Sequence, residues 1–159
     1  LALGSRVLAA VRTASAHDAD GFLDDDRYAA MMPPAAALLS ERGAFASDAA
    51  YLEYAGEVVT PCLTALAVAV GKDVSWKPLN LKVLACARHK SSAVRLAAVR
   101  ALHLLFEQVG EEYLMMLPEC LPYLSELLED DAPDVLEATV QAIKFIEDLS
   151  GESLDQYLQ

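Results

Sequence analysis

The residues best suited to metal chemistry are the three cysteines and three histidines of the chain. Cys86 and His89 lie three residues apart, and His103 is the only other histidine near them. A structural zinc site takes four ligands, usually in two close pairs, and the second pair is missing. We therefore expect a buried Cys86, a solvated His89 and no bound metal. The wide spacing of Cys62, Cys86 and Cys120 favours buried thiols in a reducing compartment over disulfides.

Other arrangements that support catalysis or cofactor binding are also missing from the sequence. It has no Gly-x-Ser-x-Gly nucleophile elbow, and its 7 glycines are scattered singly instead of forming a phosphate loop. The acidic turn at 129–134 lacks the alternating aspartates, central glycine and closing glutamate of an EF-hand. The sequence therefore predicts no catalytic residue, no cofactor and no small-molecule substrate. We expect a binding protein and not an enzyme.

A basic segment is the best candidate for binding chemistry. The net charge is -12, yet residues 72–100 hold seven basic residues and one acidic residue, whereas residues 101–159 hold fourteen acidic residues and one lysine. Lysine and arginine side chains contact RNA phosphates or acidic protein tails. The candidate contacts are Lys77, Lys82, Arg88, Lys90 and Arg100. The alternative is that these cations only balance the acidic segment that follows, because most surface charge is solvated.

Trp76 is the only tryptophan. It is a candidate partner anchor, since tryptophan is enriched at interface hot spots. It is equally a candidate packing residue, wedged between two helical repeats. We favour packing, because we expect Trp76 in a loop between helix pairs, where gaps arise.

Helical spacing positions all of these residues. Val94, Ala98, Ala101, Leu102 and Leu105 lie on one helix face, and alternation at period two is never sustained. The predicted helices are 1–17, 24–41, 47–71, 77–89, 92–110, 112–129 and 133–149, followed by a short tail at 152–158. Pro33-Pro34 should kink or restart a helix. The expected left-handed C-caps are Gly43, Gly71, Gly110 and Gly151. No apolar run reaches the roughly 18 residues of a membrane span, so we expect no membrane contact.

A repeat of about 41 residues organises the helices. Val94, Ala101, Leu102 and Leu105 superpose on Val135, Ala142, Ile143 and Ile146. Periods of roughly 40–47 residues with two helices each are typical of HEAT or armadillo arrays. The sequence thus predicts an all-α, α-solenoid fold of antiparallel helix pairs, one array over 1–159. Its approximate repeat segments are 1–45, 46–90, and 91–110 with 112–149. Because the chain begins with Leu1, we expect a piece of a longer protein, from its C-terminal part.

Three stretches resemble known families. Val94-Arg95 with Ala98 and Ala101-Leu102 resembles the second helix of a HEAT repeat, in which the arginine makes structural contacts, and 117–130 resembles a first helix with its acidic turn. Pro61-Cys62-Leu63, the run Trp76-Lys77-Pro78-Leu79-Asn80 and the closing Gly151-Glu152 resemble a narrower family. That family is the large HEAT-repeat subunit of the small-subunit processome, a U-three small nucleolar RNA-associated protein, in its C-terminal region.

The resemblance implies a structural role in a nucleolar ribonucleoprotein. Members of that family act as long scaffolds in ribosome biogenesis, supporting pre-ribosomal RNA processing, and the resemblance carries over no catalytic residue. It implies other processome proteins as partners, with any contact to pre-ribosomal or small nucleolar RNA through residues 77–100. The alternative is a transport or phosphatase-type HEAT scaffold that binds peptide segments in its concave face. The Trp76 to Asn80 run favours the processome family.

Overall fold

The computed structural model describes residues 2–17, 21 and 23–158, and its described residues form helices and turns without a strand. The α-helices are α1 (Ala2–Ala16), α2 (Asp25–Ala37), α3 (Asp48–Tyr54), α4 (Thr60–Val70), α5 (Asp73–Ala87), α6 (Ser92–Val109), α7 (Leu117–Leu127) and α8 (Pro133–Ser150). The predicted all-α fold is confirmed.

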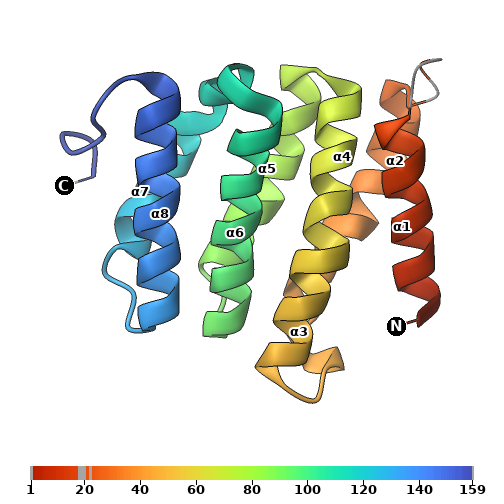
Figure 1. Cartoon of the computed structure of the whole chain (residues 1–159), viewed down its shortest axis with the longest axis horizontal. Helices are drawn as coiled ribbons and strands as arrows, with labels where there is room; N and C mark the ends of the chain where they lie inside the picture. The colour runs from red at the N-terminus through yellow and green to blue at the C-terminus, as the bar shows by residue number, and fades with distance from the viewer. Residues whose placement is uncertain (1, 18–20, 22, 159) are drawn as a thin grey trace.

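The helices alternate between two layers along the array (Figure 1). One layer holds α1, the α3–α4 unit, α6 and α8, and α1 packs on α4, α4 on α6, and α6 on α8. The other layer holds α2, α5 and α7, in which α2 packs on α5 and α5 on α7. Contacts between α5 and α6 and between α7 and α8 join the layers. This arrangement is the predicted solenoid, while the division into particular repeat segments stays a prediction.

The core follows the repeated apolar positions. In α6, Val94, Ala98, Ala101, Leu102 and Leu105 are all buried. Their equivalents in α8 are buried too, and the hydroxyl of the one polar member, Thr139, donates to the Val135 carbonyl at 2.8 Å. An i−4 bond of this kind satisfies a buried hydroxyl inside a helix. Both helices therefore present the same face to the core, one repeat apart.

Helix ends agree with the sequence in part. Gly71 and Gly151 adopt the left-handed conformation expected of C-caps, with φ of 54° and 73°. Gly110 has a positive φ of 81° but a ψ of -151°, so it ends α6 in a different conformation. The expected cap at Gly43 is wrong, because Gly43 lies inside a short 3-10 turn, Arg42–Ala44. Pro33-Pro34 lies within α2, which continues to Ala37 without a restart.

Two predicted helices differ from the structure in how they begin. The helix expected at 77–89 begins at Asp73, so Pro78 lies inside α5 and Trp76 lies on its first turn instead of in a loop. A proline in the second turn is tolerated less well than one at the first position, which is why the sequence favoured the later start. The helix expected at 112–129 consists of two parts, a 3-10 segment, Gly110–Met116, and the α-helix α7 that follows it. Pro118 thereby occupies the first turn of α7.

Candidate interaction surface

Acidic side chains of α7 and the following turn neutralise much of the basic segment. The Lys77 ammonium lies 3.1 Å from the Glu119 carboxylate. Arg88 donates from Nε to Glu126 at 2.7 Å and makes a second bond from its Nη2 to the same carboxylate. These pairs join α5, and the turn after it, to α7. The basic and acidic segments follow one another in the sequence, and the fold brings them side by side.

Arg95 belongs to the same ladder of ion pairs, in its most buried part. Its guanidinium binds the Asp130 carboxylate in a bidentate manner at 2.6 and 2.8 Å. The side chains are 19% and 6% exposed, respectively. Arg95 Nη1 also donates to the carbonyls of His89 and Lys90 at 3.0 and 3.3 Å. Arg95 therefore ties the turn before α6 to the turn before α8, as the resemblance implied for this arginine.

The ionisation of these pairs follows from their contacts. The hydrogen bond from Arg95 is the main cause that lowers the pKa of Asp130, and the bond to Asp130 raises the pKa of Arg95. The bond to Glu126 likewise raises the pKa of Arg88, and the bond from Arg88 lowers the pKa of Glu126. The Arg88 guanidinium also lies 4.2 Å from the centre of the Tyr123 ring. All four groups stay charged near neutral pH.

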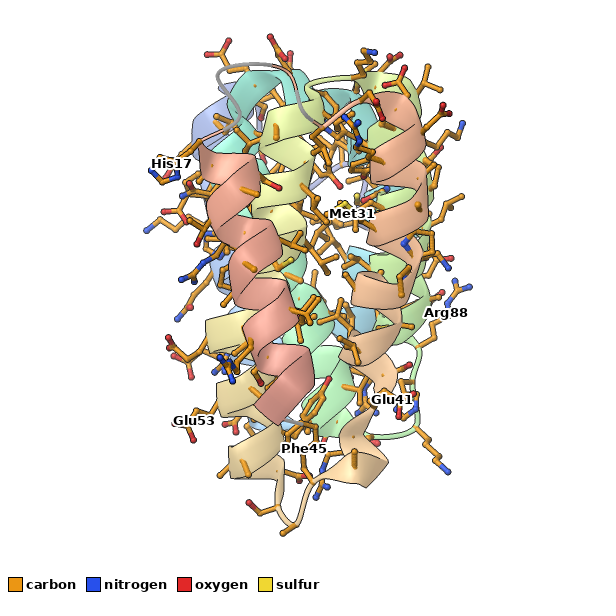
Figure 2. All side chains as sticks on the ribbon, turned by 90° about the vertical axis from the view of Figure 1, so that its right-hand side faces the viewer. His17, Met31, Glu41, Phe45, Glu53 and Arg88 are labelled. Atoms are coloured by element: carbon orange, nitrogen blue, oxygen red, sulfur yellow. The ribbon has the colours of Figure 1, made fainter. Side chains whose placement is uncertain are left out.

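Lys82, Lys90 and Arg100 have no ion pair within the part of the chain that the structure describes. Lys82 borders a hollow of about 310 Å³ between α2 and α5, together with Ser40 and His89. Arg100 borders a different hollow, of about 190 Å³, between α6 and α8, next to Asp134 and Glu137. These two hollows belong to opposite layers, so the five candidate residues do not form one patch. Arg88 points away from the helices on the side that carries α2 (Figure 2).

Trp76 is a core residue. Its side chain is 2% exposed, its Nε1 donates to the Ala67 carbonyl of α4 at 2.8 Å, and its ring lies 5.8 Å from that of Tyr113. An indole buried in this way offers no surface to a partner. The packing interpretation agrees with this position, although the tryptophan packs from a helix instead of a loop.

Asn80 is an important polar residue whose role the sequence did not reveal. It is fully buried, and its Oδ1 accepts from the Tyr113 hydroxyl at 3.3 Å and from the Cys120 thiol at 3.5 Å. Its Nδ2 donates to Glu119 at 3.5 Å. Buried amides need such partners because an unpaired one is costly. The signal available in the sequence was an asparagine on the apolar face that Leu79 and Val83 define.

The candidate metal ligands in the sequence are Cys86, His89 and His103. Cys86 is buried, the His89 ring accepts from the Ser91 N–H at 3.1 Å, and the His103 ring lies 5.0 Å from that of Phe145. No group of three metal-binding side chains forms among the residues described.

The helical stretch Asp48–Val70 is apolar and long enough to cross a membrane, but 50% of its apolar 18-residue window is buried inside the fold. Its buried face packs against α1 and α6, as in a core helix.

Comparisons with known proteins agree with this architecture. Residues 92–146, which hold α6, α7 and most of α8, match a family model described as a HEAT-like repeat. HEAT repeat-containing protein 1 homolog of Dictyostelium discoideum is 34% identical over 154 residues, covering 96% of this chain and 7% of that protein. U3 small nucleolar RNA-associated protein 10 of Phaeosphaeria nodorum is 35% identical over 159 residues, covering 99% of this chain and 9% of that protein. Its namesake in Pyricularia oryzae is 45% identical over 104 residues, covering 65% and 6%.

The chain is homologous to a segment of these HEAT-repeat proteins. The resemblance drawn from the Trp76 to Asn80 run is thereby confirmed, and so is the HEAT-type solenoid. The chain spans 6–9% of the length of these three relatives. What the whole relatives do is therefore taken up as a proposal.

Proposed function

We propose that this chain is part of a structural scaffold subunit of the small-subunit processome, which supports nucleolar pre-ribosomal RNA processing and small ribosomal subunit assembly. The supporting observation is the 35% identity, over 99% of the chain, to a protein named U3 small nucleolar RNA-associated. The two-layer helical array supports a binding role, since such arrays offer extended surfaces. The described residues offer no cluster for metal chemistry, and the relatives' names indicate no enzyme activity.

The test is purification of the tagged full-length protein followed by identification of bound proteins and RNA. The expected result is other processome proteins together with the U3-type small nucleolar RNA, and nucleolar staining of the tagged protein. Recovery of a phosphatase catalytic subunit or transport cargo would instead support the alternative HEAT scaffold that binds peptide segments.

Within this scaffold, we place RNA or acidic protein contact on the basic segment. Lys82 and Lys90 carry this role best, because Lys77, Arg88 and Arg95 already bind carboxylates of the chain itself. Phosphate contacts depend on available cations, and each adds roughly one unit to the salt dependence of binding. Arg100 lies on the other layer and would belong to a separate contact.

A charge-reversal experiment tests this contact. Lys82→Glu with Lys90→Glu should weaken crosslinking of the segment to RNA in the assembled particle and leave helicity unchanged. Lys144→Glu is the matched control, because Lys144 is also exposed but lies on α8. Arg88 is left intact, because Arg88→Glu would place a second carboxylate beside Glu126. Crosslinks to proteins alone would make this surface a protein-docking site. Normal assembly of the double variant with all its partners would show that Lys82 and Lys90 have no binding role.

A further inference from the structure

The two ends of the array differ in how they are closed. At the C-terminal end, the segment after α8 turns back beside the upper part of α8 (Figure 1). The Glu147 carboxylate accepts from the Leu154 N–H at 2.7 Å and from the Ser153 hydroxyl at 3.1 Å. Leu154 is buried as a result, and the Ser125 hydroxyl donates to the Leu158 carbonyl at 3.5 Å. This tail covers the last turns of α8.

The opposite end has no such cover among the described residues. A groove of about 500 Å³ runs between α1 and α2. Its lining residues are all apolar and include Val7, Leu8, Val11, Met31, Pro34 and Leu38. Figure 2 looks onto this end and shows Met31 between the two helices. Leu8 is buried at the base of the groove, while Val7 is 54% exposed at its edge.

The chemistry of the groove restricts what covers it. A lining without any charged side chain gives RNA phosphates or acidic tails nothing to pair with. Apolar grooves of this kind take the apolar face of another helix. The next joint of the array shows the fitting geometry, because α4 packs on α1 and α5 packs on α2. In the end-on view of Figure 2, α1 and α2 face the viewer and the groove lies between them.

We infer that a further helix pair of the same polypeptide covers this groove, one helix on α1 and the other on α2. The inference rests on the proposed function, in which this chain is one segment of a much longer scaffold. The relatives support it, since the matched segment is 6–9% of their length. Stacked repeats bury their apolar faces on their neighbours, and an end that lacks a neighbour or cap stays exposed. The α1–α2 face is thus a joint between repeats.

Thiol labelling, read at the peptide that carries each introduced cysteine, measures this cover directly. Within this segment the native thiols Cys62, Cys86 and Cys120 are all buried. Val7→Cys and Met31→Cys are made in the 159-residue chain and in the full-length protein, and their reaction rates with a maleimide are compared. We expect rates at least about tenfold lower in the full-length protein, as for side chains packed between repeats. The matched control is Val68→Cys, because Val68 is 50% exposed on α4, away from the groove. The control rate should be equal in both proteins.

Each other outcome overturns the inference. Equal rates for Val7→Cys in the two proteins would show that no helix pair covers the groove. Protection in the isolated chain that rises with its concentration would assign the groove to a second copy. Protection of the full-length protein only after partner proteins are added would assign it to a partner. Circular dichroism checks that each variant folds, and Val7→Cys is the safer variant because Val7 is half-exposed. Labelling needs no processome component, so its result is independent of the purification experiment.

Discussion

The Arg95–Asp130 ion pair should stabilise the last joint of the array, and a double-mutant cycle can measure its contribution. The variants are Arg95→Met, Asp130→Asn and their combination. Met keeps much of the arginine stem, and Asn keeps an oxygen that can accept from the Ala132 N–H, now bound to Asp130 at 2.9 Å. The cycle therefore isolates the interaction between the two charges.

The expected magnitude follows from burial. Breaking a buried pair costs more than breaking an exposed one, because the remaining charge is left without its partner. Arg95 and Asp130 are 19% and 6% exposed, so the pair lies at the buried edge of the joint. We expect a coupling free energy of roughly 1–3 kcal/mol, in the upper part of the range of about 0.5–3 kcal/mol found for side chains in direct contact. Urea denaturation followed by circular dichroism measures it.

The chain contains its own control for this reasoning. Arg88 and Glu126 make a similar bidentate contact, which joins the turn after α5 to α7, yet their side chains are 53% and 52% exposed. The cycle of Arg88→Met with Glu126→Gln should give a coupling too small to resolve, because water and salt screen exposed pairs. Equal coupling in the two cycles would refute the argument from burial.

The pH dependence of the free energy of unfolding provides a second test of the Arg95–Asp130 pair. Arg95 lowers the pKa of Asp130 in the folded state, so the folded state favours the carboxylate. The stabilisation is therefore complete well above the pKa of an unfolded aspartate, about 3.9, and is lost as pH falls through the lower folded value. The free-energy difference between the native chain and Asp130→Asn should shrink on acidification. A difference that grows toward acidic pH would contradict this sign.

Three further predictions concern the core. Trp76→Ala should lower the free energy of unfolding by about 3–5 kcal/mol, as for other buried aromatic truncations, and the native chain should show blue-shifted tryptophan fluorescence that moves to the red on unfolding. Asn80→Ala should cost roughly 1–3 kcal/mol because it leaves the Tyr113 hydroxyl without its partner, and Tyr113→Phe in the same chain should recover part of that loss. Burial raises the pKa of Cys62 to about 11 and of Cys120 to about 12, so neither thiol should react with a disulfide reagent at pH 8 until the chain unfolds, and rapid reaction in the folded state would contradict their burial.

The sequence predicted the helices because apolar spacing is a local property that the packing preserves. The repeated positions of α6 and α8 are buried as expected, from Val94 to Ile146. The start of α5 was harder to predict, because Pro78 favours a position in the first turn of a helix. In the structure α5 begins earlier, at Asp73, and this start places Trp76 against α4. Gly43 shows the same limit, because a glycine after an apolar run is equally compatible with a 3-10 turn.

The candidate surface was harder to predict because charge in a sequence does not reveal its partners. Residues 72–100 are basic and residues 101–159 are acidic, which led us to expect a free basic patch or a solvated balance. A repeat of about 41 residues accounts for the partners of three of the seven cations. Lys77 lies 42 positions before Glu119 and Arg88 lies 38 before Glu126, so successive repeats place each pair at one joint. Arg95 lies 35 positions before Asp130, which is in the turn between α7 and α8. Any RNA or protein that binds this surface must use Lys82 and Lys90 or compete with Glu119 and Glu126 for their partners, and competition would show as binding that weakens the last joint.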